Sequence, residues 1–102
     1  LGNTLDDIRS FSEQVKNMTG QQLRKVQFGQ NPDDWKPMSS IGAGVKEIRV
    51  KAVDGIYRTI YVTKFEEAVY VLHAFQKKTQ KTRKQDIELA RTRLKTLEAQ
   101  RK

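Results

Sequence analysis

Cysteine is absent from this sequence, histidine occurs once, and no long apolar run is present. Without cysteine, disulfide bonds and cysteine-ligated metal sites are excluded, and one histidine cannot build a histidine-based zinc site. No run reaches the roughly 18 apolar residues that a membrane span needs. No secretory signal segment is visible, so we expect a cytoplasmic protein.

The chain has 102 residues, of which 36% are hydrophobic. Two domains of half this length would each be too small to bury a stable core without disulfide bonds or a bound metal. We therefore predict a single domain over residues 1–102.

Positive charge is concentrated in one short segment of the chain. The net charge is +8, and residues 76–84 hold five basic and no acidic residues, whereas residues 1–44 hold five of each. A concentrated basic patch is the usual footprint of a phosphate-rich partner. A solvated basic loop and a surface that matches an acidic protein remain alternatives.

The first third of the chain predicts a helical hairpin. Thr4 is a suitable N-cap, and apolar residues then recur at steps of three and four, which makes one stripe on a helix. The stripe consists of Leu5, Ile8, Phe11, Val15 and Met18. We expect a break at Gly20, a shorter helix with Leu23 and Val26 facing inward, and a stop at Gly29.

Residues 30–44 read as a loop, in which we expect Trp35 to cover the core edge or to make a contact. After this loop, the spacing of the apolar residues changes from the helical period of 3.6 residues to the strand period of 2 residues. Three runs, residues 45–52, 56–63 and 68–75, predict strands joined by short turns, with Asp54-Gly55 as a hairpin signal. Such a series forms an antiparallel meander.

The last segment predicts a helix. Thr82 and Gln85 make a capping-box pattern, and Ile87, Ala90, Leu94 and Leu97 form its apolar stripe. The whole chain therefore predicts an α+β fold, with the helices on one face of a small antiparallel sheet.

Two strand residues are candidates for chemistry. Arg58 shares its strand face with Ile56, Ile60 and Val62, so it lies at the sheet margin, pairs with a carboxylate, or reaches a ligand. His73 is more often a structural residue in such a position, but it precedes the basic segment by only three residues.

No serine–histidine–acid set, paired carboxylates or metal-ligand spacing is visible. The available groups are arginine, lysine, tyrosine and one histidine. They suit phosphodiester cleavage of RNA, because cations stabilise the phosphorane and the RNA supplies its own 2′-OH nucleophile. The same set also describes a passive RNA binder.

Three stretches of the sequence resemble toxins of the RelE/HigB type. They are Val-Lys-Glu-Ile-Arg-Val at 45–50, Gly-Ile-Tyr-Arg-Thr-Ile-Tyr at 55–61 and Leu-His-Ala-Phe-Gln-Lys-Lys-Thr-Gln-Lys-Thr at 72–82. The resemblance covers nearly the whole chain and is closest to the phage-derived branch of the RelE/ParE superfamily. Its most specific part is residues 73–82, with Tyr57-Arg58 before it.

The resemblance implies a RelE-like fold, in which a helical hairpin packs on a twisted antiparallel sheet and a C-terminal helix follows. A further strand before the hairpin would lie upstream of Leu1 or be lost. The implied function is that of a type II toxin, a metal-independent endoribonuclease without a cofactor. It would cut mRNA on the ribosome, arrest translation and growth, and be neutralised by a helix-turn-helix antitoxin of the HigA type.

The resemblance also implies site residues. The catalytic set would be Arg49, Arg58, His73, Lys77 and Lys78. Further RNA contacts would come from Lys51, Lys81 and Lys84. The chain departs from the pattern in two ways: residues 95–102 hold no tyrosine or histidine, which some members use in catalysis, and Arg83 stands where this branch often has a proline.

Two other functions fit the same sequence. One is the ParE-type relative, which shares the fold and inhibits DNA gyrase. The other is a non-catalytic module that binds RNA or protein, for which we expect salt-sensitive binding without cleavage.

Overall fold

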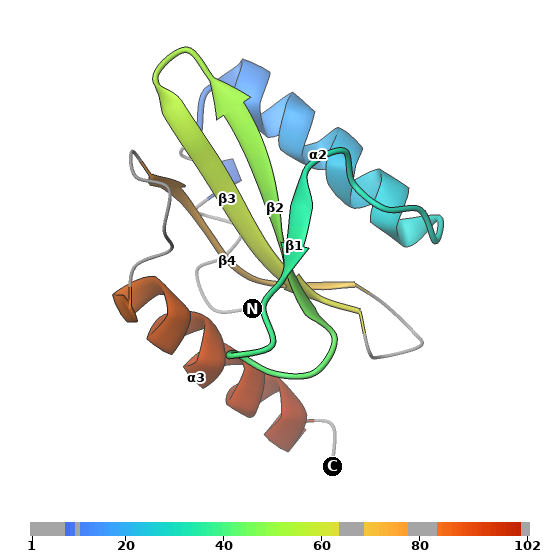
Figure 1. The fold of residues 1–102 in the computed structure, drawn as a ribbon, viewed down its shortest axis with the longest axis vertical. Coiled ribbons are helices and arrows are strands. Elements are labelled where there is room, and N and C mark those ends of the chain that lie inside the picture. Colours follow the sequence, from blue (N-terminus) through green and yellow to red (C-terminus); the bar gives the residue numbers. More distant parts are fainter. Residues whose placement is uncertain (1–7, 10, 64–68, 78–83, 101–102) are drawn as a thin grey trace.

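The computed structural model describes residues 8–9, 11–63, 69–77 and 84–100, with only the backbone of Lys77. These residues form helix α2 (Glu13–Gln27), strands β1 (Trp35–Pro37), β2 (Val45–Ala52), β3 (Gly55–Val62) and β4 (Tyr70–Lys77), and helix α3 (Lys84–Gln100). The sheet order is β1-β2-β3-β4, and each neighbouring pair is antiparallel (Figure 1). The α+β prediction and the meander are confirmed.

Helix α2 corrects the predicted break at Gly20. The helix runs through this glycine without interruption and begins after Ser12, whose hydroxyl accepts a hydrogen bond from Val15 N at 3.4 Å. A glycine inside a helix costs only about 1 kcal/mol, which the packing of the helix on the sheet outweighs. Ile8 and Arg9 are also helical, so the chain bends before Ser12 and not at Gly20.

Strand β1 lies in the segment that was predicted to be a loop. It is three residues long and pairs Trp35 with Ile48 and Pro37 with Lys46. So short a strand gives no readable alternation, and proline is tolerated because β1 is the edge of the sheet. Trp35 is half-buried, and the Lys46 ammonium lies 4.8 Å from the centroid of its ring.

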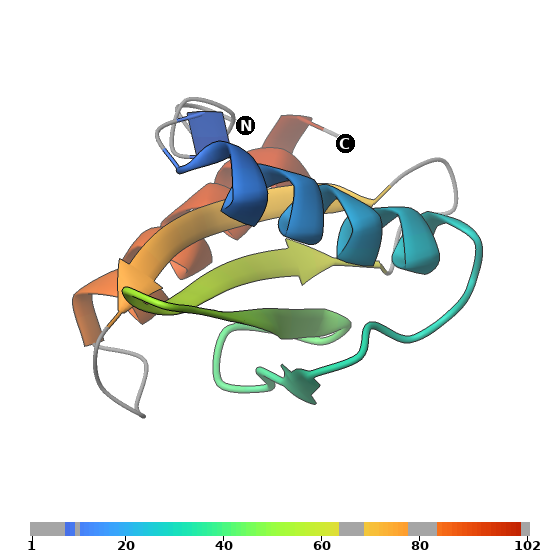
Figure 2. The same ribbon diagram turned by 90° about the horizontal axis from the view of Figure 1, so that it is seen from above.

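The two helices cover opposite faces of the sheet, which corrects the predicted single covered face (Figures 1 and 2). Both faces of the central strands are apolar. On the α3 face the buried cluster is Met38, Ile41, Val45, Ile60, Val62, Leu72, Ala90, Leu94 and Leu97. On the α2 face it is Val15, Ile48, Val50, Tyr57 and Tyr61. A sheet with two apolar faces must bury both, so each helix takes one.

The predicted stripe of α3 is confirmed. Ala90, Leu94 and Leu97 are buried and Ile87 packs against the same cluster, while Thr82 of the predicted capping box lies outside the described residues. The α3 helix lies along the part of the sheet away from the β2–β3 hairpin, whose tip extends beyond the helix (Figure 1). Helix α3 therefore does not cover the part of this face that lies nearest the hairpin.

Candidate functional site

Two arginines from neighbouring strands face each other on the α3 face of the sheet. The β2–β3 register pairs Arg49 directly with Arg58. Like charges in opposite positions of an antiparallel pair repel each other. Each arginine has a carboxylate of its own: Arg49 Nη2 donates to Asp34 Oδ1 at 2.9 Å, and Arg58 Nη1 donates to Glu47 Oε1 at 2.6 Å.

The ion pair of Arg58 and Glu47 is fully buried. The exposed fraction of both side chains is 0%, and Lys36 Nζ lies 4.0 Å from the same Glu47 oxygen. Of the alternatives for Arg58, the structure shows the one in which a carboxylate holds it. The structure gives Arg58 no open path to a ligand, and its catalytic role stays a prediction.

Arg49 and Lys51 are the cations of strand β2 that reach solvent on this face. The side chain of Arg49 is 28% exposed, and Lys51 is exposed. The register places both on the part of the sheet near the hairpin that helix α3 does not cover. Their accessibility and charge make them the strongest phosphate-binding candidates among the sequence-predicted residues that the structure describes.

His73 is a buried link between strand β4 and helix α3. Its Nε2 lies 2.9 Å from Asp86 Oδ1, in the first turn of α3. Its ring stacks on Phe75 with centroids 4.7 Å apart and an interplanar angle of 21°. Only 7% of His73 is exposed. The contacts give His73 a structural role, and its role in proton transfer stays a prediction.

The basic segment is described only at its ends. Lys77 ends β4, and its side chain lies outside the described part of the structure. Lys78 and Lys81 also lie outside the described residues. Lys84 is exposed and is the first residue of α3. The predicted roles of this segment in catalysis and RNA binding therefore stay predictions.

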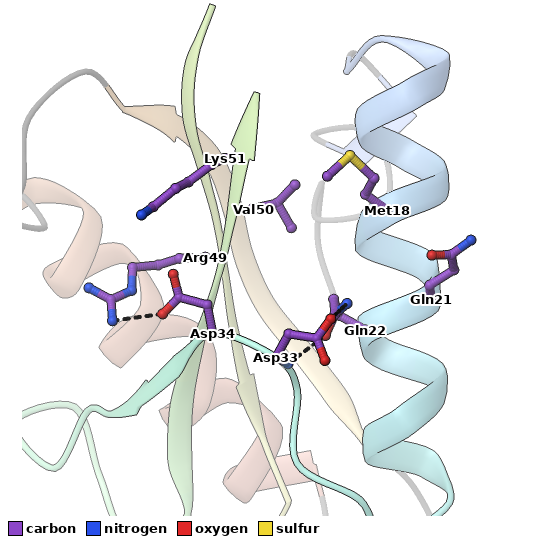
Figure 3. Close-up of a pocket in the computed structure, with 8 residues that line it drawn as sticks. All are labelled: Met18, Gln21, Gln22, Asp33, Asp34, Arg49, Val50 and Lys51. Carbon is purple, nitrogen blue, oxygen red and sulfur yellow. Dashed lines mark hydrogen bonds and ion pairs between the residues drawn. The ribbon is translucent and has the colours of Figure 1, made fainter. Parts of the chain in front are cut away.

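A pocket of about 370 Å³ opens between helix α2 and the edge of strand β2 (Figure 3). Its lining combines two amides, two carboxylates, two cations and two apolar side chains. These residues are Met18, Gln21, Gln22, Asp33, Asp34, Arg49, Val50 and Lys51. Volume and mixed lining are those of a small-molecule or single-group binding site.

A local hydrogen-bond network holds one wall of this pocket. Asp33 N donates to Gln22 Oε1 at 2.8 Å, Gln22 Nε2 donates to Asp33 Oδ2 at 3.0 Å, and Lys25 Nζ donates to Asp33 Oδ1. The bonds from Lys25 and Gln22 favour the ionised carboxyl and lower the pKa of Asp33 below its ordinary value of 3.8. These hydrogen bonds hold the segment before β1 against helix α2.

The sequence predicted two of the eight lining residues, Arg49 and Lys51, as site residues. Asp33 and Asp34 lie in the segment 30–44, which was predicted only as a loop. No sequence signal could have found the pocket, because Asp34 meets Arg49 across 15 positions and Gln22 meets Asp33 across 11. Such distant contacts are set by the way the chain folds back along the edge of β2.

A comparison with known families gives a match that spans the site and nearly all of the fold. Residues 6–95 match the model of the phage-derived Gp49-like proteins (DUF891). The chain belongs to the Gp49-like family. No curated protein matches the chain. The phage-derived part of the predicted resemblance is thus confirmed, while the RelE/HigB assignment stays a prediction.

Every described site residue of this Gp49-like chain lies inside the matched region. In the parts of the chain that the structure describes, no three side chains of histidine, cysteine, aspartate or glutamate come together as metal ligands. Within those same parts, neither helix is long and apolar enough to cross a membrane. The polar groups available at the β2 edge are cations, amides and carboxylates.

Proposed function

We propose that this Gp49-like protein is the toxin of a type II toxin–antitoxin system and cleaves mRNA on the ribosome. The family match and a fold compatible with the RelE-like architecture support the class of protein. The observation that carries the proposal is the basic part of the α3 face that helix α3 does not cover, where Arg49 and Lys51 reach solvent beside the buried Arg58.

In this proposal the cations of β2 bind the scissile phosphate. Arg49 offers a planar guanidinium that matches two phosphate oxygens, and Lys51 adds a point charge. Both stabilise the negative charge that grows on the phosphorane when the 2′-OH loses its proton and attacks phosphorus. The bond from phosphorus to the 5′-oxygen of the next nucleotide then breaks, that oxygen takes up a proton, and a 2′,3′-cyclic phosphate remains. Arg58 acts as a positioning residue, because its ion pair with Glu47 holds β2 and β3 in register at the point where Arg58 lies opposite Arg49.

Proton transfer falls to a lysine or to His73, whose ring would have to leave Asp86 to reach a substrate. The partners in this proposal are the ribosome, the mRNA and an antitoxin of the helix-turn-helix HigA type. Cleavage without a metal is expected, because the RNA supplies the nucleophile and the protein supplies the cations.

The test is to map 5′ ends of cellular mRNA minutes after induction of the protein. We expect in-frame cuts on translated messages with the wild type and a loss of about 10²–10³-fold in cutting with Arg49→Gln. Lys95→Gln is the matched control, because Lys95 is an exposed cation on α3 and lies outside the site. Arg58→Ala is a poor test, because it breaks the buried ion pair with Glu47 and so changes the stability of the sheet as well as the charge.

The other outcomes separate the alternatives. Growth arrest with intact messages and DNA damage would overturn cleavage in favour of gyrase inhibition. Normal growth with the folded protein present would overturn the toxin assignment and favour a non-catalytic module.

A further inference from the structure

The guanidinium of Arg49 lies between a like charge and a carboxylate. Arg58 is directly opposite Arg49 in the β2–β3 register, and like charges in such positions repel each other. Glu47 is already engaged, because its Oε1 accepts a hydrogen bond from Arg58 Nη1 at 2.6 Å and lies 4.0 Å from Lys36 Nζ. The carboxylate that holds Arg49 is Asp34, whose Oδ1 accepts a hydrogen bond from Nη2 at 2.9 Å. Asp34 thus fixes the direction of a guanidinium that Arg58 repels.

Asp34 is joined to Arg49 by its backbone as well as by its side chain. Asp34 O accepts a hydrogen bond from Arg49 N at 2.9 Å. A carboxylate on a backbone that is already fixed loses little further freedom when it binds a guanidinium. The exposed fraction is 38% for the Asp34 side chain and 28% for that of Arg49, so the ion pair is partly shielded from the solvent that weakens surface pairs.

The neighbouring residue, Asp33, turns toward helix α2. Figure 3 shows Asp33 directed at Gln22, whereas Asp34 is directed at Arg49. Asp33 N donates to Gln22 Oε1 at 2.8 Å and Gln22 Nε2 donates to Asp33 Oδ2 at 3.0 Å. Lys25 Nζ adds a third bond, to Asp33 Oδ1. The two adjacent aspartates therefore connect helix α2 to Arg49 across the edge of β2.

Arg49 keeps donors for an anion after it has bound Asp34. A guanidinium carries five N–H donors, and the bond to Asp34 uses one of those on Nη2. In the described part of the chain Nε is buried and has no hydrogen-bond partner, so a ligand meets the terminal nitrogens. The remaining N–H groups of Nη1 and Nη2 can contact two oxygens of one phosphate.

A guanidinium that is held in advance differs in two ways from one that moves freely. Its rotamer entropy is already lost, so it does not oppose the alignment with phosphate, and aligned charges lower the barrier of the reaction. The negative charge of Asp34 also repels the phosphate before the reaction. Asp34 should therefore lower the affinity for RNA and raise the rate of cutting.

We propose that Asp34 is a positioning residue of the cleavage site, which holds the Arg49 guanidinium for the scissile phosphate and is itself held by the contacts of Asp33 with α2. The inference rests on the proposed function, because it concerns the same phosphate. It adds a carboxylate, and through Asp33 a helix on the other side of β2, to a site that was predicted from cations and one histidine.

The test measures cutting of a defined mRNA on purified ribosomes over a range of protein concentrations, which separates the maximal rate from the half-saturating concentration. Asp34→Ala should lower the maximal rate about tenfold, less than the loss of the cation itself, because Arg49 stays but is no longer aligned. The half-saturating concentration should fall about twofold, because a charge that repels phosphate is gone.

A conservative variant separates the hydrogen bond of Asp34 from its charge. Asp34→Asn keeps an oxygen that accepts a bond from Arg49, so it should recover part of the rate and keep the lower half-saturating concentration. Glu13→Ala is the matched control, because it removes one negative charge from an exposed side chain of α2 outside the site. It should change neither quantity. Each variant is first checked for its unfolding midpoint in urea.

Gln22→Ala tests the connection to α2, because it removes two hydrogen bonds to Asp33 without a change of charge. We expect a loss of about threefold in the maximal rate, the size of one weakened hydrogen bond, and an unchanged half-saturating concentration. Gln27→Ala is the control for this variant, because Gln27 is an exposed amide on the same helix and does not line the pocket.

The mobility of the Arg49 side chain gives a readout that needs no RNA. It is measured by ¹⁵N relaxation of the Nε–H group in the full-length protein. In the wild type we expect an order parameter close to that of rigid backbone, and in Asp34→Ala one typical of flexible groups. Asp34→Asn should lie between these two values.

The outcomes separate the positioning role from the proposed function. A mobile Arg49 in the wild type, or undiminished cutting by Asp34→Ala, would overturn the positioning role and leave cleavage by the wild type established. Rate, affinity and unfolding midpoint that all fall together would make Asp34 a purely structural residue, which also overturns it. Intact mRNA with the wild type would overturn the proposed function and the positioning of a scissile phosphate with it, even if Asp34 proves to fix Arg49.

Discussion

Glu47 and Arg58 form a buried ion pair across strands β2 and β3, with 2.6 Å between Oε1 and Nη1 and no exposure of either side chain. Taking two charges out of water costs several kcal/mol for each ion, and only close pairing repays that cost. The pair lies directly beside the position of Arg49. It therefore links the stability of the sheet to the placement of the accessible cations.

Removing one partner of this pair should destabilise the protein strongly. For Glu47→Gln we expect a loss of about 3–5 kcal/mol in the free energy of unfolding, because Arg58 would stay buried without its carboxylate. Urea unfolding measures the loss. Glu13→Gln is the control, because the Glu13–Lys16 pair is exposed and should be worth about 0–1 kcal/mol. The double variant Glu47→Leu/Arg58→Met should lose less free energy of unfolding than the sum of the losses of Glu47→Leu and Arg58→Met. Strict additivity of the two losses would contradict the coupling.

The charge of Lys51 should appear in the salt dependence of RNA binding. Each phosphate contact to single-stranded nucleic acid contributes about 0.7 to the slope of log affinity against log salt concentration. Lys51→Gln should reduce the magnitude of that slope by about 0.7, as measured by fluorescence anisotropy over a salt series. Lys95→Gln should leave the slope unchanged. Equal slopes for the wild type and Lys51→Gln would remove Lys51 from the phosphate path.

Gly20→Ala should stabilise the protein, because Gly20 lies inside α2 and an added Cβ would meet nothing within 4 Å. Alanine reduces the freedom of the unfolded chain, and we expect a gain of about 0.4–1 kcal/mol. Thermal unfolding measures the gain. Gly29→Ala is the contrast, because Gly29 has φ +79° and should lose stability on the same change. A drop in melting temperature for Gly20→Ala would show that the helix needs the glycine.

The Asp33 network should make stability depend on pH in the acid range. The pKa of Asp33 is lower in the folded protein than in the unfolded chain, because Lys25 and Gln22 stabilise its carboxylate. Its contribution is therefore fully present above pH 3.8 and is lost as the pH falls through the folded-state pKa.

Comparison of the wild type with Asp33→Asn tests this dependence. At neutral pH the wild type should be the more stable of the two in urea unfolding. The difference should shrink when the pH falls below 3.8, the ordinary value for this carboxyl. A difference that stays constant through the acid range would show that the carboxylate is not what the network stabilises.

Local pattern was enough to predict the three long strands and helix α3. Val45–Ala52 has the predicted bounds, and the stripe of Ala90, Leu94 and Leu97 is buried as expected. Both follow from periodicities of 2 and 3.6, which depend only on neighbours in the chain. The predicted helix break at Gly20 was wrong, because a helix tolerates a glycine when tertiary packing supports it.

Tertiary structure alone decided what each polar residue meets. The sequence by itself determined the fold class, the phage-derived part of the resemblance and the basic character of the chain. It left open whether Arg58 pairs with a carboxylate and whether His73 has a partner, and it wrongly placed the helices on one face of the sheet. The partners are Glu47 and Asp86, 11 and 13 positions away. The pocket arises only when the loop before β1 returns along the edge of β2, since burial and long-range pairing depend on the whole fold.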